Sequence, residues 1–337
     1  MPADARPVRR PVTVVTGFLG SGKTTLLARA LGTPEMANTA VLVNEFGKVG
    51  LDHHLLRRAD EKTVLLEHGC VCCTTRDDLV EALIGLLDEV DRGFIPPLDR
   101  VVVETTGLAD PAPILYTVFS HPVLQHHYSV DLVVCTVDAV NGRLHLENNA
   151  ESEKQVAAAD TVVVTKADLL EDGEPVRALI GTLRHINPSA RVVEASFGDI
   201  PSGELLRPPV GVHDFVVGSG AGRHVSATSS TSVTFDGPVD WTAFGIWLSM
   251  LLHARGEAVL RVKGLLDVGE PGPVVLNGVQ HVIHPPQHLD AWPDEDHRSR
   301  VVFIARGISA AEILASLAAF RPMIGAGPLP IETNAPV

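Results

Sequence analysis

GFLGSGKTT, residues 17–25, is the most informative segment of this 337-residue chain. It follows a short β-branched run at residues 12–16 and leads directly into the helical pattern LLARAL at residues 26–31. Closely spaced glycines let backbone N–H groups turn inward around an anion, and the positive end of the helix dipole points at the same place. The segment therefore predicts a phosphate-binding loop between a strand and a helix.

The side chains of this loop each have a chemical role. Lys23 is expected to neutralise the outer phosphates of a nucleotide, and the hydroxyl of Thr24 is expected to ligate Mg²⁺. Both residues therefore belong to the predicted catalytic set. The nucleotide-binding residues predicted in this loop are Gly17, Gly20, Ser21, Gly22, Lys23, Thr24 and Thr25.

Apolar runs alternate with helical stretches through the first two hundred residues, which is typical of parallel strands joined by crossover helices. The chain is 45% hydrophobic but only 4% aromatic, so aliphatic side chains must build most of its core, as in a sheet covered by helices. The expected fold class is α/β: a P-loop NTPase domain with a mostly parallel central sheet flanked by helices, plus a smaller C-terminal α+β domain. Strands are expected at residues 12–16, 40–44, 100–104, 131–138, 160–165 and 191–194.

A Pro- and Gly-rich passage at about residues 200–223 marks the expected domain boundary. The predicted parts are a nucleotide-binding domain at residues 1–200, a linker at 201–224, an α+β domain at 225–322 and a tail at 323–337. In the α+β domain we expect strands at 232–237, 259–268, 274–284 and 300–307, and helices at 240–254 and 309–320.

Two further motifs follow predicted strands, at the edge where open α/β sheets bind ligands. Glu104 can hold Mg²⁺ through water, and Gly107 lacks a Cβ, so it can approach a γ-phosphate and change conformation when that group leaves. In the second motif the Asp168 carboxylate can accept hydrogen bonds from N1 and N2 of guanine, which favours GTP and GDP. Thr165 stands where such motifs usually carry Asn. The predicted base-site residues are Thr165, Lys166 and Asp168.

Three of the four cysteines crowd into Gly69-Cys70-Val71-Cys72-Cys73, which is unlike the spacing of a disulfide-stapled secreted protein. Three thiolates bind Zn²⁺ or another soft or borderline divalent ion and leave one tetrahedral position open, which suits a site that exchanges its ion. Candidates for the fourth ligand are Glu67, His68 and His121. Two alternatives stay open for the thiols, namely inert packing and redox chemistry.

Charge and hydropathy exclude some classes of partner. The formal net charge of −14 repels nucleic-acid phosphates, so no nucleic acid is expected as a partner. No apolar run reaches the roughly 20 residues that span a bilayer, and no export signal follows the Arg-rich start. We therefore expect a cytoplasmic protein with no membrane partner.

The segments GFLGSGKTT, NEFGKVGLD, GCVCC and ETTGLADP, followed by TKAD, resemble the CobW-type metallochaperone GTPases, which are relatives of the GTPases that assist nickel insertion into urease and hydrogenase. LRVKGLLDV and RVVFIARG also resemble the C-terminal domain of that family. The resemblance implies hydrolysis of GTP to GDP and phosphate with Mg²⁺, and turnover is expected to be slow because the sequence shows no unambiguous Gln-type residue to orient the attacking water. The residues that it implies for this reaction are Lys23, Thr24, Glu104 and Gly107, and those for metal binding are Cys70, Cys72, Cys73, His121 and Glu45, with Thr24 on Mg²⁺.

The expected function is therefore a GTP-hydrolysing metallochaperone that binds Zn²⁺ and delivers it to a client metalloprotein under control of the nucleotide. One alternative is a Co²⁺ chaperone for cobalamin or metalloenzyme maturation, and a nucleotide-dependent homodimer stays open. A second class is a metal-sensing or storage protein in which the nucleotide is a structural ligand. A third is an ATP-dependent small-molecule kinase, which the Asp168 motif disfavours.

Overall fold

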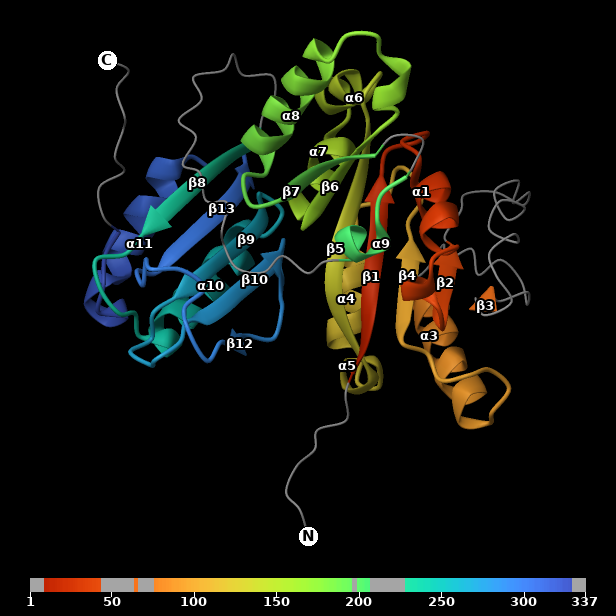
Figure 1. Ribbon diagram of the computed structural model, residues 1–337. Coiled ribbons are helices and arrows are strands. Elements are labelled where there is room, and N and C mark those ends of the chain that lie inside the picture. Colours follow the sequence, from red (N-terminus) through yellow and green to blue (C-terminus); the bar gives the residue numbers. More distant parts are fainter. Residues whose placement is uncertain (1–8, 44–63, 66–75, 196–198, 207–227, 329–337) are drawn as a thin grey trace. The chain divides into compact units, whose positions relative to one another are not determined.

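The computed structural model describes residues 9–43, 64–65, 76–195, 199–206 and 228–328 (Figure 1). The chain divides into two compact units, residues 1–180 with 192–208 and residues 181–191 with 209–337. Each unit is described by itself, and the domain boundaries predicted from the sequence stay a prediction. Within the described residues, no helix is long and apolar enough to cross a membrane.

The first unit is built on a sheet that contains seven strands within the described residues, in the order β3-β2-β4-β1-β5-β6-β7. The pairs β2 with β3, β2 with β4, β1 with β4, β1 with β5 and β5 with β6 are all parallel. The strands are β1 (Arg10–Gly17), β2 (Thr39–Val43), β3 (Val64–Leu65), β4 (Arg100–Glu104), β5 (Tyr128–Asp138), β6 (Thr161–Thr165) and β7 (Arg191–Ala195). The predicted parallel sheet and P-loop fold class are therefore confirmed.

Helices connect these strands and cover both faces of the sheet (Figure 1). Neighbouring residues of β1 point to opposite faces, yet Val14 and Val15 are both buried, at 0% and 1% exposed. On one face Leu26 and Leu27 of α1 share a core cluster with Val15 and with residues of β4 and β5. The helical segments are α1 (Lys23–Ala30), η1 (Pro34–Met36), α3 (Arg76–Asp91), α4 (Ala112–Ser120), α5 (Leu124–His127), α6 (Gly142–Asn148), α7 (Ala150–Ala158), η2 (Ala167–Leu169), α8 (Glu174–Ile186) and α9 (Ser202–Leu205).

The second unit carries an antiparallel sheet with strand order β11-β10-β9-β13-β8, and β12 also pairs with β10. Its core joins this sheet to α10 and α11 through aromatic side chains. Trp247 packs its ring against Phe244 and Phe303, with ring centroids 5.4 and 5.9 Å apart. The elements are β8 (Thr228–Thr234), α10 (Trp241–Arg255), β9 (Val259–Leu266), β10 (Val274–Val279), β11 (Val282–Ile283), β12 (Gln287–His288), β13 (Arg300–Arg306) and α11 (Ala310–Ile324).

Two details of the second unit differ from the sequence-based expectation. The single strand expected at residues 274–284 is wrong, because Gln280 has a φ of 53° and the chain reverses there, so that β10 pairs antiparallel with β11. The last helix is also longer than expected, because Pro322 sits in its final turn without ending it and the helix stops at Gly325, with a φ of 82°.

Candidate nucleotide-binding site

The phosphate loop leaves β1 through residues whose backbone conformations favour glycine. Gly17, Gly20 and Gly22 have φ values of 140°, 71° and 90°. Residues with a side chain rarely adopt these backbone conformations. At Gly17 a Cβ would also overlap the backbone and side-chain oxygens of Thr136 on β5. The three glycines therefore let the loop turn tightly into α1, as the sequence predicted.

Lys23 opens α1 and reaches back across the loop. Its Nζ donates to the carbonyl oxygens of Gly17 and Phe18, at 2.9 and 3.1 Å, and the residue is 8% exposed. The ammonium group is therefore held on the concave side of the loop. A positive charge there, beside the N-terminal end of a helix, suits the β- and γ-phosphates of a nucleotide.

Thr24 and Glu104 meet at the carboxyl edge of the sheet, although 80 residues separate them. The hydroxyl of Thr24 donates to Oε1 of Glu104 at 2.7 Å, and Glu104 is 4% exposed at the end of β4. Hydroxyl and carboxylate oxygens are hard donors of the kind that Mg²⁺ prefers, so these residues fit that ion. When bound beside Lys23, Mg²⁺ would neutralise charge on the transferring phosphate.

Gly107 lies directly against the phosphate loop. A Cβ built on Gly107 would lie 2.7 Å from the backbone N and Cα of Leu19, closer than real Cβ atoms come. Thr105, two residues earlier, is tied to β1 through its N–H, which donates to the oxygen of Val15 at 2.9 Å. The segment after β4 thus touches the phosphate loop at Leu19, and this close approach requires glycine at position 107.

Residues of the predicted base site follow β6, next to the same loop. The hydroxyl of Thr165 donates to the carbonyl oxygen of Ser21 at 2.6 Å, so Thr165 braces the phosphate loop. Lys166 has a φ of 59°, and its Nζ lies 2.8 Å from Oδ2 of Asp138. Asp168 lies in η2, half-buried. The structure therefore brings Ser21 and all three base-site residues to one edge of the sheet.

Asp138, at the end of β5, is a site residue that the sequence analysis missed. Besides Lys166, it accepts the backbone N–H of Val140 at 2.8 Å. Burial opposes ionisation of Asp138, but hydrogen bonds from Lys166, Val140 and Asn141 outweigh it and lower its pKa. The carboxylate therefore stays charged and fixes Lys166 beside the base site. A strand that ends in Asp within LVVCTVD was the available signal.

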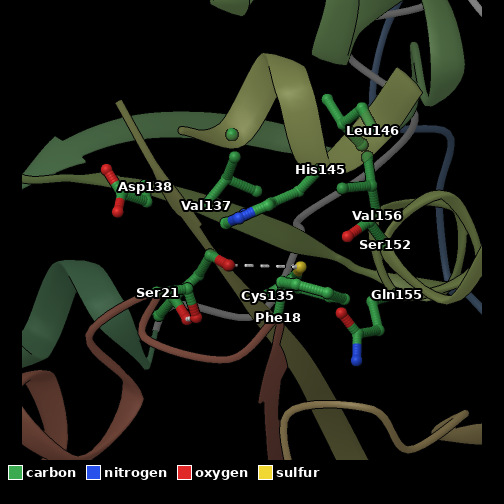
Figure 2. A pocket seen from close by; sticks show the side chains of 12 residues that line it. Phe18, Ser21, Cys135, Val137, Asp138, His145, Leu146, Ser152, Gln155 and Val156 are labelled. Atoms are coloured by element: carbon green, nitrogen blue, oxygen red, sulfur yellow. Dashed lines mark hydrogen bonds between the residues drawn. The ribbon is translucent and has the colours of Figure 1, made fainter. Parts of the chain in front are cut away.

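A small pocket of about 10 Å³ lies behind the phosphate loop, with room for about one water molecule. Phe18 and Ser21 line it from the loop, and β5, α6 and α7 complete its walls (Figure 2). The ring of Phe18 packs against that of His145, with centroids 4.4 Å apart. Cys135 is also in the wall, and burial raises the pKa of its thiol to about 12, so this cysteine is a protonated core residue.

Most of the predicted zinc ligands lie in the part of the chain that the structure does not describe. Cys70, Cys72, Cys73 and Glu45 lie outside the described residues, as do the alternatives Glu67 and His68. Among the described residues, no group of three or more His, Cys, Asp or Glu side chains could hold a metal ion. Their assignment stays a prediction.

His121 follows α4, which runs back from the carboxyl edge of the sheet towards the start of β5 (Figure 1). The structure therefore does not bring His121 together with Lys23, Thr24 and Glu104. Its Nδ1 accepts the backbone N–H of Val123 at 3.3 Å. A metal bound through Nδ1 would have to displace that hydrogen bond.

Comparison with known proteins identifies the architecture. The family described as "CobW/HypB/UreG, nucleotide-binding domain" matches residues 11–194. The chain belongs to the CobW/HypB/UreG family. The predicted resemblance is therefore confirmed, and the "Cobalamin synthesis protein cobW C-terminal domain" matches residues 228–321, over the second sheet.

Relatives in the CobW/HypB/UreG family match almost end to end. "Zinc chaperone YjiA" of Escherichia coli is 36% identical, over 92% of this chain and 98% of the relative. "Zinc chaperone CobW" of Pseudomonas aeruginosa is 30% identical, over 90% and 89%. The crystal structure of Zn(II)-bound YjiA GTPase from E. coli has 33% identity and a TM-score of 0.68, over 93% of this chain and 99% of that one. The predicted class, a GTP-hydrolysing metallochaperone, agrees with these names.

Proposed function

We propose that this protein is a GTPase that carries zinc to a client metalloprotein and releases it according to the state of the bound nucleotide. The observation that carries the proposal is the hydrogen-bonded pair of Thr24 and Glu104 beside the Lys23 ammonium group. This pair offers Mg²⁺ its oxygen ligands at the point where a phosphate loop and a switch segment meet. The near full-length similarity to relatives named as zinc chaperones supports zinc as the cargo.

Each part of the nucleotide has residues suited to it. Lys23 and the backbone of the loop bind the β- and γ-phosphates, and Thr24 and Glu104 would hold Mg²⁺, which would neutralise phosphate charge there. The N–H of Gly107 approaches the γ-phosphate and loses that partner after hydrolysis. Asp168 accepts from guanine, and Lys166 is fixed beside the base by Asp138.

The position of the cysteine motif in the sequence supports coupling between zinc and nucleotide. β3 ends at Leu65 and α3 begins at Arg76, so both flanks of the motif are described. Cys70 comes five residues after Leu65, and five extended residues span at most about 17 Å. Two strand spacings, about 10 Å, separate β3 from β4, which ends at Glu104. The chain is therefore long enough for the thiols to approach the magnesium site.

Hydrolysis would then control zinc through the segments that join the two sites. With GTP and Mg²⁺ bound, the first switch, which includes Glu45, and the segment of Gly107 are ordered around the γ-phosphate, and the intervening thiols are constrained. Departure of the γ-phosphate relaxes them, and zinc passes to the client. The described residues present no obvious group to orient the attacking water, so unaided turnover is expected to be slow.

The phosphate edge also offers a surface for a second copy of the chain. Leu19 and Leu108 are 56% and 51% exposed, and they flank the contact between the loop and Gly107. Two exposed leucines next to the phosphate loop and the segment of Gly107 suit a homodimer that forms only in one nucleotide state.

The test uses two variants of the full chain, Lys23→Ala and the triple variant Cys70→Ser, Cys72→Ser, Cys73→Ser. Lys23→Ala is expected to slow GTP hydrolysis by roughly 100-fold or more because phosphate charge is no longer neutralised, while zinc affinity without nucleotide is kept. The triple variant is expected to lose zinc affinity and to keep GDP binding. Isothermal titration with Zn²⁺ and GDP and a phosphate-release assay measure these effects.

Cys135→Ala is the matched control, because this fourth cysteine is a buried core residue. It is expected to bind zinc as the wild type does. Unchanged zinc affinity in the triple variant would rule out the thiol site, and GTP hydrolysis at the wild-type rate in Lys23→Ala would rule out the nucleotide site. Equal competition by ATP and GTP would argue against a guanine-specific enzyme.

A further inference from the structure

Helix α7 contacts the segment that carries Gly107, although nothing in the sequence motifs connects the two. Gln155 of α7 is 1% exposed, and its Nε2 donates to the carbonyl oxygen of Gly107 at 3.2 Å and to that of Ala109 at 3.0 Å. The preceding residue, Lys154, lies 3.3 Å from Oδ2 of Asp110. Three contacts from two adjacent residues therefore hold the segment 107–110 against α7.

The orientation of the Gln155 amide follows from these contacts. With the nitrogen towards the two carbonyl groups, both hydrogens of the amide are used, whereas the flipped orientation would set three oxygens against one another. The oxygen Oε1 then faces the pocket behind the phosphate loop (Figure 2). It is buried there with no hydrogen-bond partner in the described part of the chain.

A buried, unsatisfied amide oxygen is destabilising, by an amount comparable to the gain from a hydrogen bond. An apolar residue at this position would avoid the unsatisfied oxygen, but it would remove the two hydrogen bonds to the carbonyl oxygens of Gly107 and Ala109. The free-energy cost of burying Oε1 without a partner is therefore best explained by the two hydrogen bonds that Gln155 donates to the segment of Gly107.

That segment is held from its other side by the phosphate loop. Gly107 meets the backbone of Leu19 closely enough to exclude a side chain, and Thr105 is bonded to β1. With both carbonyl groups fixed by Gln155, the peptide groups that join Gly107 to Leu108 and Ala109 to Asp110 have a set orientation, so the segment is anchored before and after Leu108. The position of the Gly107 N–H relative to a γ-phosphate then depends on α7.

We infer that Gln155 is a positioning residue for γ-phosphate recognition: it sets the Gly107 segment so that the site distinguishes GTP from GDP. This inference rests on the proposed role of Gly107 as the residue that contacts the γ-phosphate. GDP lacks that group, so its affinity depends on the phosphate loop and the base site, whereas the hydrogen bonds that Gln155 donates go to the segment of Gly107.

The test compares Gln155→Met, which keeps the length of the side chain but removes the two donors, with Gln155→Glu, which sets a carboxylate against two carbonyl oxygens. Affinities for GDP and for a non-hydrolysable GTP analogue are measured with Mg²⁺ present, together with kcat and KM for GTP. We expect the affinity for the analogue to fall about tenfold in Gln155→Met and further in Gln155→Glu, with kcat reduced and GDP affinity within about twofold of wild type.

Ser152→Ala is the control, because Ser152 lies one turn earlier on the same helix, is buried in the same pocket wall and donates no hydrogen bond to the segment of Gly107. It is expected to leave both affinities unchanged. Equal weakening of GDP and analogue in Gln155→Met, or a change in neither, would overturn the inference. Failure of the proposed function is recognised separately. In that case Lys23→Ala would keep the full rate of GTP hydrolysis, whatever the effect of the substitutions at Gln155.

Discussion

Thr165 uses its hydroxyl to brace the phosphate loop, through the 2.6 Å bond to the carbonyl oxygen of Ser21. A Cβ built on Gly22 would also lie only 3.5 Å from Oγ1 of Thr165, so loop and threonine are in direct contact. The residue thus fills the position of the usual Asn by supporting the loop. In the proposed function, reading the base is left to Asp168 and to the side chain of Lys166.

Thr165→Val tests this division of roles, because valine keeps the shape and removes the hydroxyl. Affinities for GDP and for IDP, whose base lacks the N2 amino group, are both expected to fall about fivefold, since the lost bond supports phosphates common to both. Isothermal titration gives the two dissociation constants. A change in the ratio of the two affinities would mean that Thr165 reads the base after all.

Some residues of the site could be predicted from the sequence and others could not, for a physical reason. The glycines, Lys23 and Thr24 are determined by local backbone geometry and by chemistry within nine residues, and the structure brings Glu104 to them as expected. Gln155 acts on carbonyl groups 46 and 48 residues away, and its partners follow from tertiary packing alone. No local pattern marks such a residue.

At the scale of elements, α10 begins with a capping residue that also connects two helices. Oδ1 of Asp240 accepts the N–H of Ala243 at 2.8 Å, and the N–H of Asp240 donates to the oxygen of Ile324 at the end of α11 at 2.7 Å. The backbone bond would survive replacement of the side chain. The side-chain bond satisfies a donor that the first turn of a helix leaves without a partner.

Asp240→Ala is therefore expected to lower the free energy of unfolding of the second unit by about 1 kcal/mol. Urea denaturation followed by tryptophan fluorescence measures this, and GDP affinity is expected to stay unchanged. Asp290→Ala is the control, because Asp290 is an exposed residue of the same unit. A loss no larger than that of the control would contradict the capping role.

The elements themselves were predictable to different degrees. β4 has the expected bounds, and β1, β2, β6 and β7 differ by one or two residues at their ends, because a buried parallel strand is marked by a continuous apolar run. β5 begins three residues before the expected start, at Tyr128, whose hydroxyl donates to the oxygen of Leu83 on α3. The reversal at Gln280 was missed because no Gly, Asn or Asp marks it.

At the scale of the whole molecule, the two units have separate cores. One cluster lies wholly within residues 15–205 and another wholly within residues 233–326. All three tryptophans of the chain, Trp241, Trp247 and Trp292, belong to the second unit. Tryptophan fluorescence therefore reports on the second unit, whereas a ligand at the phosphate loop binds the first.

Mg²⁺ and GDP at about 100 times the dissociation constant are expected to raise the thermal midpoint of the first unit by roughly 5–10 °C, because the ligand binds its folded form. Calorimetry should show this shift, while the midpoint followed by tryptophan fluorescence stays in place. If the fluorescence midpoint rose by the same amount, the two units would unfold as one cooperative block. ATP in place of GDP serves as the control for guanine specificity.

The family and its two parts were predictable because several motifs occur together in a fixed order, and the comparisons confirm both. The proposed zinc site was less predictable. Its cysteines lie between β3 and α3, outside the described residues, and the sequence around them defines ligand types without their geometry. Which ion is carried depends on that geometry, since thiolates accept zinc and cobalt alike.

The pairing of β1 with β5 has a consequence for nucleotide exchange. These strands pair from Arg10 with Tyr128 to Gly17 with Thr136, with one shift of register between Val12 and Thr13, in the middle of a sheet buried on both faces. Amide hydrogens in such a central ladder are released to solvent only when the entire unit opens. The phosphate loop thus follows directly from the strand pair that is expected to open last in this unit. We therefore expect GDP to be exchanged for GTP while β1 and β5 stay paired.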